Sequence, residues 1–178
     1  MENYNTARGM LLAAPIPQQT KTYKPVSHEQ LMDLTLESIH QSGFVLDQEL
    51  YTSAREGKVA NGKFTIKNVA DSEMQLEIGW QNSYDKSLSL KFAIGTRIMI
   101  CQNGCVSGDY GAFKKKHVGE IQTFTPQAIT EYIKKAGEAL KYTYGWTNTN
   151  TGSGNGTNSS GFEGLAGGLR NGMGAFGY

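Results

Sequence analysis

The clearest pattern in the chain is a pair of alternating segments, 74–81 and 88–94. Apolar residues occupy every second position of both segments, with mostly polar residues between them. A period of two is typical of strands that place one face on a core and the other in water. The polar turn 82–87 joins the segments, and the pair therefore predicts neighbouring antiparallel strands.

Further strands are predicted on either side of this pair. Residues 50–54 and 63–67 have strand character, and Asn61-Gly62 between them predicts a hairpin turn, because both residue types tolerate positive φ. After Gly95, which interrupts the alternation, Ile98 and Ile100 continue the strand pattern.

Two amphipathic helices are predicted, over 27–43 and 125–141. The first begins at Ser27, whose hydroxyl suits an N-cap. The second is expected to begin with Thr125 as N-cap and Pro126 at the first helical position, where a missing N–H costs nothing. Each helix carries an apolar stripe that needs a surface to cover.

These elements predict one α+β domain over 27–146. We expect a mainly antiparallel, curved sheet of about five strands, with both helices on one face. Residues 1–26 contain three prolines and are expected to form an extended arm. Residues 147–178 are rich in Gly, Asn and Ser and predict a flexible tail. Spaced apolar residues near its end are a candidate contact for a partner or a second copy, against the plainer interpretation of a solubilising tail.

Charge changes this picture only locally. The chain has 178 residues and a formal net charge of +1, so no bulk attraction to nucleic acid or membranes is expected. However, 28–56 contains six acidic residues against one basic, and 86–116 contains six basic residues against one acidic. This asymmetry predicts one basic face. No apolar run approaches the roughly 20 residues of a membrane span, and we expect neither a membrane contact nor a secretory signal.

Polar and basic residues gather around the strand ends. The turn after Trp80 is either an ordinary polar turn or part of a binding cleft, and Arg97 is either a solvated charge or a fork for phosphate or carboxylate. The lysine run before His117 is either a solvated loop or a phosphate contact. The candidate nucleic-acid- or ligand-binding residues are Asn82, Ser83, Tyr84, Asp85, Lys86, Arg97, Asn103, Lys114, Lys115, Lys116 and His117.

Metal and catalytic chemistry are less well supported. Cys101, Cys105 and His117 fall short of the four ligands of a structural zinc site, and we expect no metal and no cofactor. The two cysteines are interpreted as reduced thiols, because four residues apart they would pair only in a strained loop. His117 with Asp85 or Asp109 is the enzyme alternative, but nothing in the sequence brings them together, so we favour binding over catalysis.

Several short motifs in a fixed order resemble a known family. The arm before the first helix and the strand ends carry Tyr23-Lys24-Pro25-Val26, Asn82-Ser83, Asp85-Lys86-Ser87, Gly95-x-Arg97, Cys101-x-Asn103, Ser107-Gly108-Asp109 and Lys116-His117. Over 23–140 the chain resembles the phage- and plasmid-related family called domain of unknown function 932. The resemblance implies a phage or mobile element in the cytoplasm of a bacterial host, and no particular reaction. This chain departs from the family in its short, Gly/Asn-rich C-terminal part.

Two functions follow as hypotheses. In the first, the protein is a phage-type accessory protein that binds single-stranded DNA in replication or recombination. Its lysines and arginine would contact phosphates, and Tyr84, Tyr110 or Phe113 would stack on bases. In the second, it is an inhibitor or sequestering protein acting against a host defence. Its small-ligand or nucleotide pocket would be formed by Asn82, Asp85, Arg97, Asn103 and His117.

Overall fold

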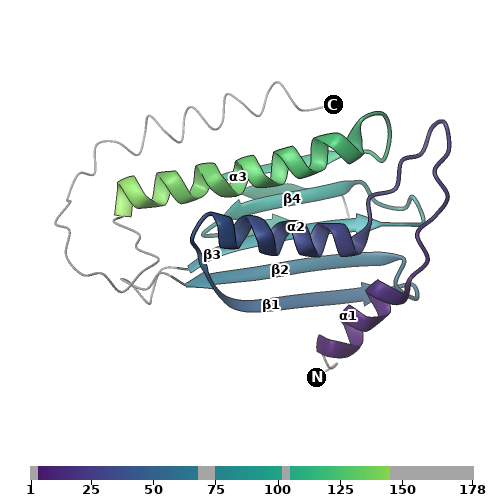
Figure 1. Ribbon diagram of the computed structural model, residues 1–178, viewed down its shortest axis with the longest axis horizontal. Helices are drawn as coiled ribbons and strands as arrows, with labels where there is room; N and C mark the ends of the chain where they lie inside the picture. Colours follow the sequence, from purple (N-terminus) through teal and green to yellow (C-terminus); the bar gives the residue numbers. More distant parts are fainter. Residues whose placement is uncertain (1–3, 68–74, 102–104, 145–178) are drawn as a thin grey trace.

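The computed structural model describes residues 4–67, 75–101 and 105–144 and has an α+β architecture. A five-stranded antiparallel sheet forms its centre (Figure 1), which confirms the predicted fold class. The predicted tail, 147–178, lies outside the described residues.

The main sheet has the strand order β1-β2-β3-β4-β7. Its strands are β1 (Val45–Ala54), β2 (Val59–Lys67), β3 (Gln75–Ser83), β4 (Leu90–Gly95) and β7 (Gly111–Lys115). A separate two-stranded hairpin is formed by β5 (Ile98–Ile100) and β6 (Val106–Gly108).

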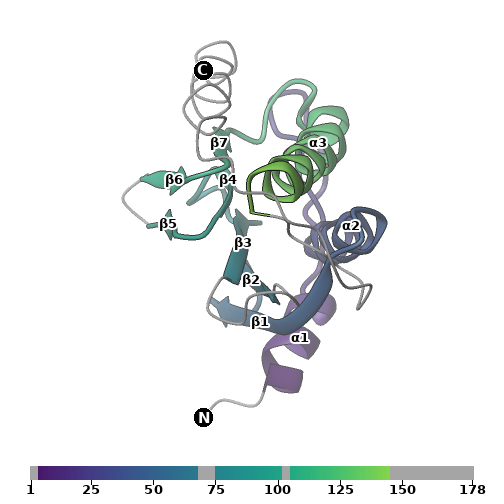
Figure 2. The same ribbon diagram turned by 90° about the vertical axis from the view of Figure 1, so that its left-hand side faces the viewer.

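Helices cover one face of the main sheet, as predicted. Figure 2 shows α2 (His28–Gln41) and α3 (Ile121–Tyr144) on one side of the sheet and the β5–β6 hairpin on the other. A third helix, α1 (Tyr4–Ala13), lies beside the edge strand β1. Ser27 caps α2 as expected, since its hydroxyl accepts a hydrogen bond from the backbone N–H of Gln30 at 3.2 Å.

The alternation in β3 places the core. Leu76, Ile78 and Trp80 are fully buried in the main hydrophobic cluster. The residues between them point to the opposite face, where the β5–β6 hairpin covers part of the sheet. A Cβ added at Gly79 would meet the Ile98 side chain, so the hairpin approaches β3 closely at that position.

The N-terminal arm and the start of α3 differ from the sequence prediction. Residues 4–13 form a helix before the proline-containing segment, in place of a fully extended arm. Helix α3 begins four residues before the expected cap, because the Glu120 carbonyl already accepts the backbone N–H of Phe124 at 2.8 Å. Thr125 therefore lies within the helix and donates its hydroxyl to the Ile121 carbonyl at 2.6 Å, and Pro126 is also inside it.

The predicted hairpin turn at Asn61-Gly62 is wrong, because both residues lie within β2. The β1–β2 turn falls at 55–58, where Arg55, Glu56 and Gly57 all have positive φ. Gly62 instead leaves room for the side chain of Trp80. A Cβ at Gly62 would come within 2.5 Å of the Trp80 ring, which lies across it from β3.

We expect Gly62→Ala to destabilise the protein by about 2 kcal/mol, because the added methyl group overpacks a buried ring. The urea midpoint of unfolding measures this change. Gly9→Ala is the matched control: Gly9 is an exposed residue of α1, nothing lies within 4 Å of its Cβ position, and Ala is the better helix former. A Gly62→Ala variant that is as stable as the control would contradict the packing argument.

Candidate nucleic-acid interface

Four segments that are distant in sequence meet at one end of the sheet, the right-hand end in Figure 1. They are the segment 21–24, the β1–β2 turn, the β3–β4 turn and the stretch after β7. The backbone N–H of Lys24 donates to the His117 carbonyl at 2.8 Å, and that of Tyr84 donates to the Lys58 carbonyl at 2.7 Å. These bonds join the segments in two pairs, and the Tyr23 hydroxyl links the pairs by donating to the Tyr84 carbonyl at 3.2 Å.

Basic side chains predominate at this end. Segments 21–24, 55–58, 84–89 and 114–120 together contain eight basic residues and three acidic ones. We call five of these lysines, with exposed or half-exposed side chains, the lysine rim: Lys24, Lys58, Lys86, Lys114 and Lys116. Helices α2 and α3 also begin at this end (Figure 1), so their positive dipole ends add to the local potential.

Asp85 belongs to the same end, but its charge is compensated. Its carboxylate accepts hydrogen bonds from the Arg55 guanidinium at 2.7 Å and from the Ser87 backbone N–H at 3.0 Å. Partial burial by itself would raise the pKa of Asp85, but the bonds from Ser87 and Arg55 and the charge of Arg55 lower it to about 2. Asp85 therefore shapes the turn and removes Arg55 from the set of unpaired bases.

Two of the predicted lysines rest on aromatic rings. The Lys86 ammonium is 4.8 Å from the centre of the Tyr23 ring, and Lys86 itself has a φ of 64° in the turn. The Lys115 ammonium is 3.7 Å from the centre of the Phe124 ring on the helix side of the sheet. Lys115 is thus directed toward α3, whereas its neighbours Lys114 and Lys116 are exposed to solvent.

Beneath the lysine rim lies a buried polar network centred on Asn82. The Asn82 amide nitrogen donates to the Val26 carbonyl at 2.7 Å and lies 3.0 Å from Nδ1 of His28. Its side-chain oxygen lies 2.7 Å from Nε2 of His117. The His28 Nε2 lies 3.0 Å from the Gly57 carbonyl, so one amide connects α2, β3, the β1–β2 turn and the segment after β7.

The chemistry of the partners assigns the protons in this network. A carbonyl accepts only, so the Asn82 NH₂ group must face Val26, and its second hydrogen points at Nδ1 of His28. His28 is therefore neutral with its proton on Nε2, directed at Gly57. The Nε2 of His117 carries the proton that the Asn82 oxygen accepts.

Both histidines are held in the neutral form. Burial lowers the pKa of His28 to about 4, with the charge of His117 acting in the same direction and the bond to Gly57 opposing it. Burial likewise lowers the pKa of His117 to about 4. A second proton on His28 would also place two donors face to face at Asn82. The arrangement therefore supports the rim structurally.

Ser83 and Tyr84 also serve the local structure. The Ser83 hydroxyl bonds to the backbone of Leu88 across the turn at 3.0 and 3.1 Å. The Tyr84 hydroxyl accepts the backbone N–H of His28 at 2.8 Å, and its ring stacks on the His28 ring at 3.7 Å between centres. Tyr84, Tyr110 and Phe113 are all buried, so the expectation that they stack on bases is wrong for this structure.

Arg97 lies away from the other predicted site residues. It follows the C-terminal end of β4, whereas the lysine rim is at the N-terminal end, roughly 17 Å away along six residues of strand. Asp109 lies with Arg97, accepting its backbone N–H at 3.1 Å and the hydroxyl of Thr96 at 2.6 Å. Asn103 lies outside the described residues. Of the expected ligand pocket, the structure thus brings only Asn82 and His117 into contact, with Asp85 nearby in the turn.

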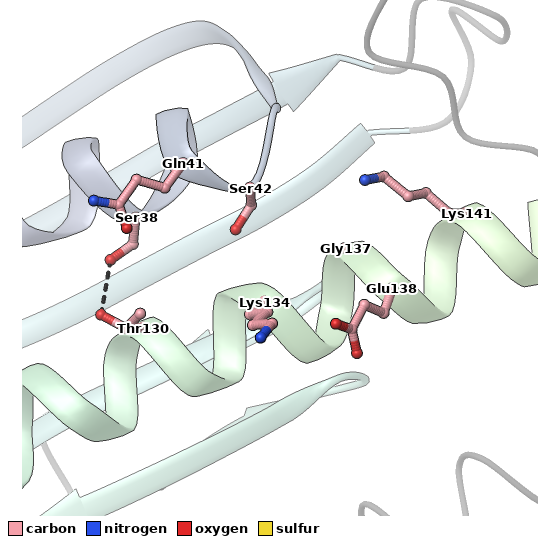
Figure 3. Close-up of a pocket in the computed structure, with 8 residues that line it drawn as sticks. All are labelled: Ser38, Gln41, Ser42, Thr130, Lys134, Gly137, Glu138 and Lys141. Atoms are coloured by element: carbon pink, nitrogen blue, oxygen red, sulfur yellow. Dashed lines mark hydrogen bonds between the residues drawn. The ribbon is translucent and has the colours of Figure 1, made fainter.

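A groove of about 270 Å³ lies between α2 and α3 at the opposite end of the molecule. Figure 3 shows the Ser38 hydroxyl facing that of Thr130, and the two oxygens are 3.1 Å apart. Lys141 and Glu138 also line the groove. Both helices end near it (Figure 1), and Lys134 adds a second basic side chain to the lining, so the groove carries charges of both signs.

Two further observations concern metals and membranes. Within 4–67, 75–101 and 105–144, no three His, Cys, Asp or Glu side chains are grouped so that they could hold a metal ion. In the same part of the chain, no helix has the length and apolar character needed to cross a membrane.

Comparison with known families identifies the class of protein. A family model described as Domain of unknown function (DUF932) matches residues 17–152, which include every element from α2 to α3. The chain therefore belongs to this family. The search of curated proteins and the search of solved structures each gave no match.

Sequence reasoning missed several residues of this end of the molecule. Tyr23 and His28 were not expected to contact β3, although each bonds to Tyr84 or its neighbour. Lys24 and Lys58 were not expected to join the lysine run. The motif before the first helix was a usable signal for Tyr23 and Lys24, whereas nothing in the local sequence around Lys58 indicated its place.

Proposed function

We propose that the protein binds the phosphate backbone of single-stranded DNA through the lysine rim. In this proposal it acts as an accessory protein of a phage or mobile element, in replication or recombination. The observation that carries it is the convergence of Lys24, Lys58, Lys86, Lys114 and Lys116 from four separate segments on one end of the sheet. Within the described residues, none of these five lysines forms an ion pair that would explain the convergence, and only Lys86 rests on an aromatic ring.

The dimensions of the rim suit several phosphates. Lys58 precedes β2 and Lys114 lies on β7, three strand spacings away, which is roughly 14 Å at the usual distance between strands. A surface of this width takes a short stretch of nucleic-acid backbone. Lys and Arg contacts to phosphate are independent of sequence, so we expect binding without base preference.

A single strand is the preferred form of the ligand for a physical reason. The rim lysines lie on turns and strand ends, so they do not form a straight row of the kind that a rigid duplex requires. A flexible single strand adjusts its backbone to such positions. With the aromatic rings buried, affinity must come from charge, and binding should weaken steeply as salt increases.

Fluorescence anisotropy with a labelled single-stranded oligonucleotide and its duplex tests this function. We expect binding at low salt, a preference for the single strand, and loss of most of the affinity at high salt. The triple variant Lys86→Gln, Lys114→Gln, Lys116→Gln should bind at least tenfold more weakly, because each neutralised contact is lost with little effect on the fold.

The matched control changes the same charge elsewhere. Lys134→Gln, Lys135→Gln, Lys141→Gln removes three exposed lysines from α3, away from the rim. We expect this control to bind like the unaltered protein. Absence of binding at low salt, or equal loss in both triple variants, would overturn the proposal.

The alternative, sequestration of a small ligand or nucleotide against a host defence, finds no specific support in the geometry. Asn82 and His117 are engaged with each other, and Arg97 lies at the other end of β4. The α2–α3 groove lies at the opposite end of the molecule from these residues.

A further inference from the structure

The two cysteines lie directly opposite each other at the end of the β5–β6 hairpin. The ladder pairs Ile100 with Val106, and the next residues along each strand are Cys101 and Cys105. The Cys101 backbone N–H donates to the Cys105 carbonyl at 3.1 Å, which extends the pairing by one step. Directly opposed residues have Cα atoms about 5 Å apart, inside the range that a disulfide spans.

The Cys101 side chain also acts on the Cys105 thiol. Hydrogen bonding to the Cys101 side chain and its charge raise the pKa of the Cys105 thiol. The Cys101 sulfur in addition accepts the backbone N–H of Cys105 at 3.2 Å. The Cys105 thiol therefore holds its proton more tightly than usual, and the Cys101 sulfur is the one that receives an N–H bond.

A buried lysine faces this pair. Lys91 is 1% exposed, and its ammonium donates to the Cys101 carbonyl at 2.5 Å and to the Gln81 side-chain oxygen at 2.8 Å. Burial lowers the pKa of Lys91, whereas the negative charge of Cys101 and Cys105 opposes that shift. The cationic form of Lys91 and a thiolate on Cys101 thus stabilise each other, as positive groups do at reactive cysteines.

We propose that Cys101 and Cys105 form a reversible dithiol–disulfide site that reacts with low-molecular-weight disulfides. The Cys101 thiolate attacks one sulfur of the external disulfide, forming a mixed disulfide and releasing one small thiolate. The Cys105 thiol then loses its proton to solvent and attacks the Cys101 sulfur, which closes the cross-strand disulfide and releases the second small thiolate. The protein loses two electrons and two protons, and the external disulfide takes them up as two thiols.

Closure of this bond would fasten the hairpin. The β5–β6 hairpin covers the face of the sheet at Gly79 and bonds to Lys91, and its two strands are only three residues long. A covalent link between Cys101 and Cys105 ties the two strands together directly after the last ladder pair, Ile100 and Val106. This inference does not rest on the proposed function, and its failure would leave DNA binding untouched.

Oxidised glutathione is the probe. The full-length protein is incubated with it, remaining thiols are blocked by alkylation, and the intact mass and the peptide spanning 98–114 are measured. We expect loss of both alkylatable thiols, loss of two hydrogen atoms from the mass, no retained glutathione, and full reversal by dithiothreitol. Stable glutathione adducts on both cysteines, or two thiols that stay alkylatable, would overturn the proposal.

Variants test the order of attack and the role of Lys91. Cys105→Ser should retain glutathione on Cys101, whereas Cys101→Ser should react at least several-fold more slowly, because Cys105 lacks the supporting N–H bond. Lys91→Gln should slow alkylation of Cys101 near neutral pH, and Lys63→Gln, a surface lysine on the same sheet, should not. If Lys91→Gln fails to fold, the Cys101→Ser and Cys105→Ser rates alone decide: equal rates would contradict the assignment of Cys101 as the attacking thiol.

Discussion

Replacing Asn82 by Ala is expected to cost about 3 to 5 kcal/mol of folding stability, because the change leaves three buried groups without a partner. The Val26 carbonyl, Nδ1 of His28 and Nε2 of His117 all bond to the Asn82 amide. No water can reach them without opening the junction between α2 and β3. Urea unfolding followed by circular dichroism measures the loss as a lower midpoint with an unchanged slope.

Asn61→Ala is the matched control. Asn61 also makes two side-chain hydrogen bonds, to Thr52 and Gln81 at 2.8 Å each, but it lies on the opposite, half-exposed face of the sheet. Solvent replaces its partners there, so we expect a loss of about 1 kcal/mol. Similar losses of folding stability in the two variants would show that burial does not determine how much the Asn82 network contributes to stability.

Acidification is expected to destabilise the protein between about pH 6.5 and pH 4. His28 and His117 both have pKa values lowered from 6.5 to about 4 in the folded state. In that interval the unfolded chain binds more protons than the folded one, so their contribution is complete above pH 6.5 and is lost as the pH falls toward 4. At about 1.4 kcal/mol per pKa unit, each histidine contributes roughly 3 kcal/mol to this loss.

Chemical denaturation at a series of pH values tests this expectation. His117→Gln keeps a donor for the Asn82 oxygen but removes one titrating group, so its stability should fall about half as steeply with pH. His40→Gln removes an exposed imidazole from α2 and serves as the control, with an expected slope like that of the unaltered protein. A flat profile between pH 6.5 and 4.5 would contradict the assignment of neutral, buried histidines.

The strands and helices could be predicted where periodicity alone decides them. The alternation around Trp80 and Phe92 gave β3 and β4 and the buried face of the sheet. The turn prediction failed at Asn61-Gly62. The same two residues can mark a hairpin turn or, as here, a strand position where a glycine lies beneath an indole ring. The predicted helix start at Thr125-Pro126 also failed, because the helix already begins at Ile121 and both residues lie inside it.

The candidate interface could be predicted only in part. The run ending at Lys116 was visible as a charge cluster, and Lys86 was near a turn. Their assembly with Lys24 and Lys58 depends on bonds between residues distant in sequence, such as Lys24 to His117. Lys91 is a second residue whose surroundings could not be predicted. It alternates with the apolar residues of β4 and would be assigned to solvent, yet the β5–β6 hairpin covers it.

The dependence of DNA affinity on salt tests the central claim most directly. For a single strand, each phosphate contact contributes about 0.7 to the slope of log affinity against log salt. The variant lacking Lys86, Lys114 and Lys116 should therefore show a slope smaller by about 2 than that of the unaltered protein. The α3 triple variant should keep the full slope. An unchanged slope in the rim variant would contradict the assignment of these lysines to phosphate binding.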